Sequence, residues 1–203
     1  MPTSALLTAC CAPFLWVVLK VIFSVIFATD CFGADPGMEL VIFFGRIATL
    51  FLFLTLSFSF LGRIFKTWGI PRMRRVLGLS VFFYATLHLV SYLIFLAGLE
   101  VGDYLQDLMT KKRIILGSLA YFFLFLLAAT SFDSLVRSLG RAWFLLHRLA
   151  YLIAGLVVFH IFLSTKENFA LAFFSCCAYL ILTGLRLHKA WRLTKSRAPF
   201  QEG

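Results

Sequence analysis

The sequence predicts an all-α integral membrane protein, a bundle of six transmembrane helices with both termini in the cytoplasm. Of its 203 residues, 62% are hydrophobic and only 14% are charged, whereas roughly a quarter of the residues in an ordinary globular domain carry a charge. The apolar residues gather in six stretches, each close to the length of about 20 residues that spans a bilayer. Basic residues concentrate in alternate connections between these stretches, which is typical of the cytoplasmic side. This composition excludes a disordered chain, a nucleic-acid-binding protein and a secreted disulfide scaffold.

The first three predicted spans alternate with one acidic and one basic connection. An apolar stretch at 12–29 is followed by the connection 30–39, which holds three carboxylates and no base. The second stretch, 40–61, ends where the basic connection 62–76 begins. The third stretch, 77–98, therefore starts on the basic side of the membrane and returns to the acidic side.

The last three predicted spans continue this alternation. Residues 114–131 follow three consecutive bases, residues 142–164 follow a connection with two arginines, and residues 168–187 lead into a basic tail. Because all the connections are short, we expect residues 1–203 to form a single membrane domain. Any water-soluble domain needed for function then belongs to another protein.

The orientation follows from the distribution of charge. Most of the 19 Lys and Arg residues lie in the connection 62–76, in the region 132–148 and in the C-terminal tail. An excess of Lys and Arg marks cytoplasmic connections, so we expect these segments and both termini on the cytoplasmic side. The opposite, outer side carries most of the nine acidic residues.

Ionisable side chains inside the spans are candidates for function, since a charge at the centre of a membrane helix costs roughly 2.5 to 3.5 kcal/mol on insertion scales. Lys20 can extend its side chain to the interface, pair with a neighbouring helix or serve a function. Arg46 can also reach the interface, or it can hold an acidic group such as a haem propionate through bidentate hydrogen bonds. The sequence leaves these alternatives open.

Three of the four histidines lie within predicted spans, His88 in the third and both His147 and His160 in the fifth. Neutral imidazole is a common axial ligand of haem iron, and a b-type haem between helices takes one imidazole from each side. At 1.5 Å per residue, His88 lies about 16 Å along its span, and His160 and His147 lie about 27 and 8 Å along theirs. We expect His88 to pair with His160 and His147 to lie at a second level near the inner face. Depth alone does not decide this pairing, since His88 differs in depth by about 11 Å from His160 and by about 8 Å from His147.

His147 and His160 do not share one face of a regular helix. Their separation in sequence turns the two side chains roughly 140° apart on an ideal α-helix. Both can serve one cleft only if the helix bends, carries a π-bulge or lies beside two different partners. His188, at the inner end of the sixth span, is at a level suited to facing His147, and an ordinary interfacial histidine beside a basic tail is the alternative.

Several motifs together point to a known family. They are Gly33–Pro36 ahead of Gly45-Arg46, residues 74–79 (RRVLGL) ahead of 85–92 (ATLHLVSY), and residues 139–151 (LGRAWFLLHRLAY) ahead of His160. Their order and spacing resemble the MsrQ family, also called YedZ, over residues 32–191. Members of that family are haem-binding membrane subunits of the periplasmic methionine-sulfoxide reductase system, and they belong to the ferric-reductase-like transmembrane domains.

The resemblance implies a six-helix bundle in the bacterial inner membrane that binds one or two b-type haems and FMN. It implies that His88, His147 and His160 are haem ligands, and it assigns no catalytic residue to the chain itself. Electrons from the quinone pool or a cytosolic flavin reductase would pass to the periplasmic molybdopterin enzyme MsrP. That partner reduces methionine sulfoxide in proteins.

Charged surfaces at the two ends of the bundle are candidate contact sites. Arg72, Arg74, Arg75 and Arg148 at the inner end can attract an anionic donor, a flavin phosphate, a haem propionate or anionic lipid. They can equally serve only to set the topology. The acidic outer connection 30–39 can dock the reductase partner or be an ordinary solvated loop.

Two other functions remain open from the residues alone. A stand-alone ferric or quinone reductase of the same fold would act without a molybdopterin partner. A small transporter or channel would need polar residues along a path, broken helices or repeats. We find no repeat and no carboxylate within a predicted span, so the transporter is the least favoured of the three.

Overall fold

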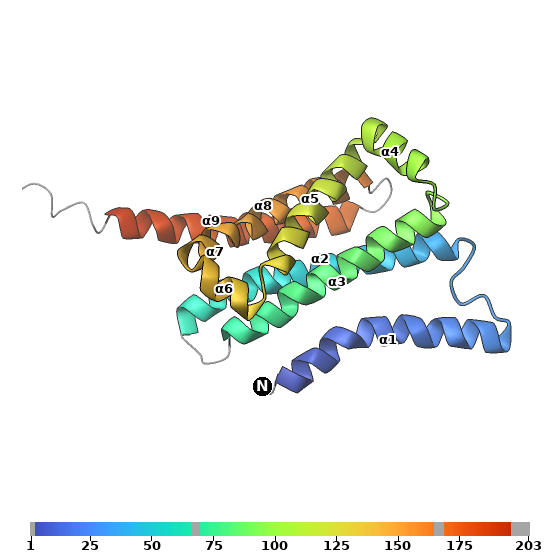
Figure 1. Cartoon of the computed structure of the whole chain (residues 1–203), viewed down its shortest axis with the longest axis horizontal. Helices are drawn as coiled ribbons and strands as arrows, with labels where there is room; N and C mark the ends of the chain where they lie inside the picture. Colours follow the sequence, from blue (N-terminus) through green and yellow to red (C-terminus); the bar gives the residue numbers. More distant parts are fainter. Residues whose placement is uncertain (1–2, 66–69, 165–168, 196–203) are drawn as a thin grey trace, which may run out of the picture.

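The computed structural model describes residues 3–65, 70–164 and 169–195, and the regular structure in these ranges is entirely helical (Figure 1). The helices in chain order are α1 (Thr3–Phe27), α2 (Pro36–Phe65), α3 (Ile70–Phe95), α4 (Val101–Thr110), α5 (Lys112–Ala129), α6 (Asp133–Leu139), α7 (Arg141–Leu146), α8 (Leu149–Ser164) and α9 (Phe169–Lys195). The predicted all-α class is therefore confirmed.

Five helical stretches are long and apolar enough to cross a membrane. They are Ser4–Phe27, Pro36–Phe58, Arg72–Phe95, Lys112–Ala129 and Arg141–Ser164. The chain is accordingly a multi-pass membrane protein. The sixth predicted span, 168–187, begins outside the described residues and otherwise lies in α9, where the apolar part is shorter, Ala172–His188. The beginning of α1 and the end of α9 lie at the same end of the bundle (Figure 1).

Two antiparallel helix pairs form the centre of the molecule. Helix α2 packs along α3, and α5 packs along α8. Large side chains from both pairs join in one apolar core, including Phe51 and Leu77 from the first pair and Leu124 and Ile153 from the second. The space between the two pairs holds the site described below.

The predicted fifth span is not one continuous helix. It divides at His147 and Arg148 into α7 and α8. The amides of Arg148 and Tyr151 bond to carbonyls three residues earlier rather than four, which tightens the backbone locally. The break separates His147, in the turn, from His160 on α8.

Helix α1 is attached to the rest of the bundle through a buried tyrosine. The Tyr84 side chain is fully buried; its hydroxyl donates to the Cys10 carbonyl at 2.7 Å and accepts from the Phe14 amide at 3.1 Å. That amide and carbonyl are four residues apart, so the hydroxyl is inserted into the helical ladder of α1. Pro13, which lacks an N–H, lies beside this point. An inserted side chain and a proline together explain why α1 bends (Figure 1).

We expect Tyr84→Phe to destabilise the protein by about 1–2 kcal/mol, because it removes two hydrogen bonds inside the apolar region and retains the ring. The phenylalanine ring can still pack on Phe51, whose centroid lies 5.5 Å from that of Tyr84. The thermal unfolding temperature of the purified protein in detergent measures the effect. Tyr179→Phe on α9 is the control, and equal unfolding temperatures for the two variants would show that the inserted hydroxyl contributes nothing.

Lys20, a candidate for function from its position in the first span, has a structural partner. Its Nζ lies 3.0 Å from Glu39 Oε1 at the start of α2 and 4.4 Å from the centroid of the Phe32 ring. Of the alternatives for Lys20, the structure therefore shows the pairing with a neighbouring helix.

The short helix α4 crosses the end of the bundle and connects α3 to α5 (Figure 1). Tyr92 on α3 donates to the Asp107 carboxylate on α4, and the hydroxyls of Tyr104 on α4 and Ser118 on α5 lie 2.7 Å apart. A hydrogen bond from Lys111 and a second from Tyr92 hold the pKa of Asp107 below its usual value. These contacts hold α4 across the ends of its two neighbours.

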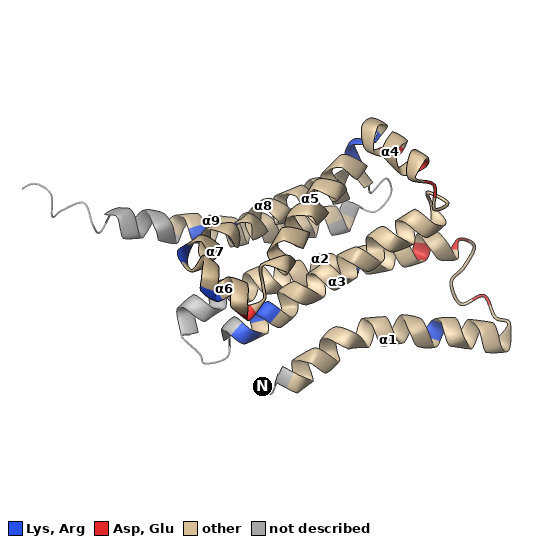
Figure 2. Ribbon diagram, in the orientation of Figure 1, with Lys and Arg blue, Asp and Glu red and all other residues tan. Residues whose placement is uncertain are grey.

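Charge differs between the two ends of the bundle (Figure 2). The acidic residues of α4 and the start of α2 lie at one end, close to the bases that open α5. Basic residues of α3, α7 and α9 lie at the other end. There Arg75 pairs with Asp133 at the start of α6, and this hydrogen bond lowers the pKa of the Asp133 carboxyl.

Candidate functional site

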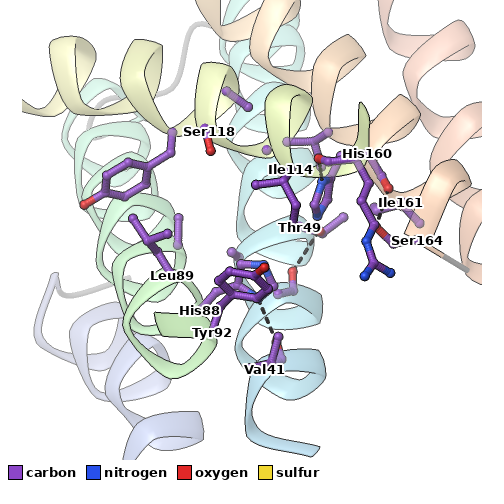
Figure 3. Close-up of a pocket in the computed structure, with 18 of the residues that line it drawn as sticks. Val41, Thr49, His88, Leu89, Tyr92, Ile114, Ser118, His160, Ile161 and Ser164 are labelled. Atoms are coloured by element: carbon purple, nitrogen blue, oxygen red, sulfur yellow. Dashed lines mark hydrogen bonds between the residues drawn. The ribbon is translucent and has the colours of Figure 1, made fainter. Parts of the chain in front are cut away.

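A cavity of about 700 Å³ lies between the two helix pairs, with walls formed by α2, α3, α5 and α8 (Figure 3). Most of its lining side chains are aliphatic or aromatic. The polar lining residues are Arg46, Thr49, His88, Tyr92, Tyr104, Arg113, Ser118, Tyr121, His160 and Ser164. An apolar cavity with a few polar groups is the usual form of a site for an organic ligand or cofactor.

His88 of α3 and His160 of α8 lie on opposite walls of this cavity and are held in the same way (Figure 3). The Nδ1 atom of His88 lies 2.7 Å from the Val41 carbonyl oxygen, and that of His160 lies 2.7 Å from the Arg113 carbonyl oxygen. A carbonyl only accepts, so each Nδ1 carries the proton. In each neutral ring the lone pair is then on Nε2, as in a metal-ligating histidine oriented by its second nitrogen.

The distance between the two rings suits one metal atom. Their centroids are 6.2 Å apart and their planes are nearly perpendicular, at 89°. A histidine nitrogen lies about 2 Å from a bound transition metal, so two imidazoles on opposite sides of one atom have centroids roughly 6 Å apart. The structure therefore brings together His88 and His160, the pair that we expected.

The cavity is built from two equivalent halves. Val41 and Arg113, Gly45 and Gly117, and His88 and His160 are each separated by 72 positions in the sequence. Every lining residue other than Met38, Leu96 and Tyr104 has a lining counterpart 72 positions away. The pair α2–α3 therefore forms one wall of the cavity, and the pair α5–α8 forms the opposite wall with equivalent residues.

This repeat corrects our expectation from the sequence that none exists. The pattern Ile-x-x-Gly-x-x-Ala-x-x-Phe-Leu-Phe-Leu occurs at 42–54 and again at 114–126. The signal was therefore available, but in a chain this rich in Phe and Leu it is visible only when one copy is aligned on the other. The repeat also identifies lining residues that the sequence analysis missed, among them Arg113 and Gly117.

The arginines expected to contact an acidic group separate into two sets. Arg46 lines the cavity, as does the half-buried Arg113. Arg74, Arg75 and Arg148 are not among the lining residues. They lie near the basic end of the bundle, where Arg75 is paired with Asp133.

His147 lies apart from the cavity, in the turn between α7 and α8. Its ring stacks on Trp143 with centroids 3.9 Å apart, and its Nδ1 lies 3.1 Å from the Trp143 carbonyl oxygen. Trp143 Nε1 in turn donates to the Thr130 carbonyl at the end of α5. The structure thus positions His147 at a second level, towards the basic end, and brings neither His88 nor His160 beside it. His188 is exposed on α9.

The protein's own side chains do not form a closed metal centre in the part of the chain that the structure describes. There, no three His, Cys, Asp or Glu side chains come together as a metal-binding group. Two histidines facing each other across an apolar cavity can instead supply both axial ligands to a metal whose remaining ligands come from a planar organic group.

Comparison with known proteins gives consistent matches. The family described as the ferric reductase like transmembrane component matches residues 44–158. The protein-methionine-sulfoxide reductase haem-binding subunit MsrQ of Polaromonas naphthalenivorans is 35% identical over 191 residues, covering 93% of this chain and 84% of that protein. The subunit of the same name from Pectobacterium atrosepticum is 37% identical over 178 residues, covering 87% and 86%. No solved structure matches this chain.

Proposed function

Because this chain belongs to the ferric reductase-like transmembrane family, and within it to the MsrQ subunits, we propose that it is a membrane haem protein that carries electrons to a methionine-sulfoxide reductase partner. The observation that carries the proposal is the pair His88 and His160. Their Nδ1 atoms are engaged by backbone carbonyls, and their ring centroids are 6.2 Å apart across an apolar cavity.

The residues of the cavity fit a b-type haem. The two-fold repetition of the walls offers similar apolar surfaces to the two faces of a flat ring, and each wall provides one histidine. Arg46 and Arg113 are the cationic residues of the lining and are suited to hold propionates. When bound, haem b supplies one-electron chemistry, and its reduction potential depends on the axial ligands, burial and nearby charges.

The chain's own groups orient the ligands and exclude water. The carbonyls of Val41 and Arg113 fix the tautomer of each histidine, which keeps both Nε2 lone pairs available. Apolar residues from both pairs line the cavity, among them Leu52 and Leu124. With α4 held across the outer end by Tyr92 and Tyr104, these side chains limit the access of water.

The proposal extends to topology and partners. Helix α9 crosses the bacterial inner membrane as a sixth span, and both termini lie in the cytoplasm. The beginning of α1 and the end of α9 lie at one end of the bundle, and the bases at that end support this orientation. Electrons then enter from the quinone pool or a cytosolic flavin reductase at the basic end and leave to a periplasmic molybdopterin partner, MsrP, at the acidic end.

A second level of cofactor binding near the basic end is part of the proposal. His147 is the candidate ligand for a second haem there. The exposed Arg74 and Arg148 are candidate contacts for an FMN phosphate or a propionate. The distance in sequence between His147 and His160 and the break between α7 and α8 support two separate levels.

Absorption spectroscopy of the purified protein with its partner tests this function. We expect a b-type reduced-minus-oxidised spectrum after haem-replete expression. With MsrP present in catalytic amount, complete reoxidation of the reduced haem without oxygen should require both MsrP and a methionine-sulfoxide peptide. Omitting either component is the control. A colourless protein would contradict the haem assignment, and rapid reoxidation by ferric chelates without MsrP would favour a stand-alone reductase.

A further inference from the structure

His88 and His160 each place two ring atoms, Nδ1 and Cε1, close against a glycine, and the two contacts are nearly identical. A Cβ atom added to Gly45 would lie 2.9 Å from His88 Nδ1 and 3.1 Å from its Cε1. A Cβ atom added to Gly117 would lie 2.9 Å from His160 Nδ1 and 3.0 Å from its Cε1. Carbon atoms do not approach this closely without displacement, so only glycine leaves room for each imidazole in its observed place.

The glycine and the carbonyl that holds each ring belong to one helical turn. Gly45 follows Val41 by four residues on α2, and Gly117 follows Arg113 by four residues on α5. Residues four apart lie one above the other on the same face of a helix. An imidazole can therefore reach the Val41 or Arg113 carbonyl only by lying across the backbone of the glycine. A side chain at the glycine position would block this approach, so the hydrogen bond requires glycine there.

From this geometry we infer that Gly45 and Gly117 are equivalent positioning residues, each of which holds one axial histidine of the haem in the orientation for ligation. This inference rests on the proposed function. A methyl group at either position pushes the ring from its carbonyl and tilts Nε2 away from the metal, and the effect is the same in kind from either side. The two glycines thus act through His88 and His160 and need no contact with the haem.

Carbon monoxide binding to the reduced haem provides the test. An iron with two histidine ligands has no open position, so the haem between His88 and His160 should bind little carbon monoxide. All variants are compared in a His147→Ala background, which removes the contribution of the proposed second haem. In Gly45→Ala and in Gly117→Ala one ligand is weakened, and we expect carbon monoxide binding together with a loss of haem affinity of about 10- to 100-fold, as for other outer contacts of metal ligands. A change in the low-spin electron paramagnetic resonance signal of the oxidised protein should accompany it.

Two other glycines provide matched controls. Gly155→Ala on α8 places a Cβ 3.1 Å from the Tyr179 hydroxyl oxygen, a comparable crowding that involves no histidine. Gly78→Ala on α3 meets only Thr55 Cγ2 at 4.0 Å. Both should retain the wild-type spectrum and bind no carbon monoxide. If Gly155→Ala behaves like the two cavity variants, the effect is general packing and the inference is wrong.

Measurements on haem-depleted protein separate positioning from folding. Without haem, the histidine can rotate into the cavity and away from the new methyl group, and the variant then loses only the hydrogen bond from Nδ1 to the carbonyl. The fall in unfolding temperature relative to wild type should therefore be smaller in the depleted protein than in the haem-containing protein. Equal destabilisation with and without haem would overturn the inference. A haem-containing wild type whose glycine variants keep their haem and bind no carbon monoxide would also overturn it while leaving the proposed function intact. A colourless wild type would overturn both.

Discussion

We expect His88→Ala and His160→Ala each to abolish the b-type spectrum of the cavity. Alanine removes one of the two imidazoles, and it also leaves the Val41 or Arg113 carbonyl without that donor. The loss of haem affinity should exceed the roughly 10- to 100-fold that follows from changing an outer contact of a metal ligand. Haem quantified per chain as its pyridine complex, beside the reduced-minus-oxidised spectrum, measures the effect.

His147→Ala is the matched control for these two variants. His147 lies outside the cavity, stacked on Trp143. The His147→Ala protein should keep the haem of the cavity and lose only the part of the spectrum that belongs to a second site. Loss of the entire spectrum in His147→Ala, or its retention in His88→Ala, would contradict the pairing of His88 with His160.

Removing haem should destabilise the bundle strongly. The cavity of about 700 Å³ lies between the pairs α2–α3 and α5–α8. A haem in this cavity would contact both helix pairs and so add contacts between them. Binding to the folded state alone stabilises a protein by about 4 kcal/mol at a free ligand concentration of 1,000 times Kd. We therefore expect a clear fall in the unfolding temperature of protein purified from haem-limited cells, relative to haem-replete cells.

The same comparison in the His88→Ala, His160→Ala double variant is the control. That variant lacks both histidines of the cavity, so its unfolding temperature should depend on haem supply much less than that of wild type. Equal unfolding temperatures for depleted and replete wild type would show that the bundle does not depend on an occupant of the cavity. Limited proteolysis under both conditions gives a second measure of the same difference.

The sequence predicted the features that depend on length and average polarity. A run of about 20 apolar residues has few alternatives to a membrane helix, so each of the first four predicted spans lies largely within one helix. The helices α1 and α3 begin earlier than predicted, at Thr3 and Ile70. Depth along a helix follows from a fixed rise per residue, but it did not distinguish His160 from His147 as the partner of His88. The cavity does, because it contains His88 and His160 together.

Features that depend on contacts between distant residues were not predicted. The break at His147 involves neither glycine nor proline, so no local signal marks it. Helix α4 has only ten residues, too few for a periodic pattern to stand out within a polar connection. The insertion of Tyr84 into α1 joins residues 70 or more positions apart, and its sequence signal is an ordinary tyrosine in an apolar run.

The constant offset of 72 positions between the two walls of the cavity has an evolutionary consequence. Tandem duplication of an ancestral helical hairpin accounts for a common spacing of carbonyl, glycine and histidine in α2–α3 and α5–α8. Before such a duplication, a single hairpin could have built the same centre as a symmetric homodimer. The two copies now differ in polarity at some positions, such as Arg46 against Ser118 and Tyr92 against Ser164. Fusion into one chain allowed the halves to diverge at these positions, so that the two walls of the cavity are no longer identical.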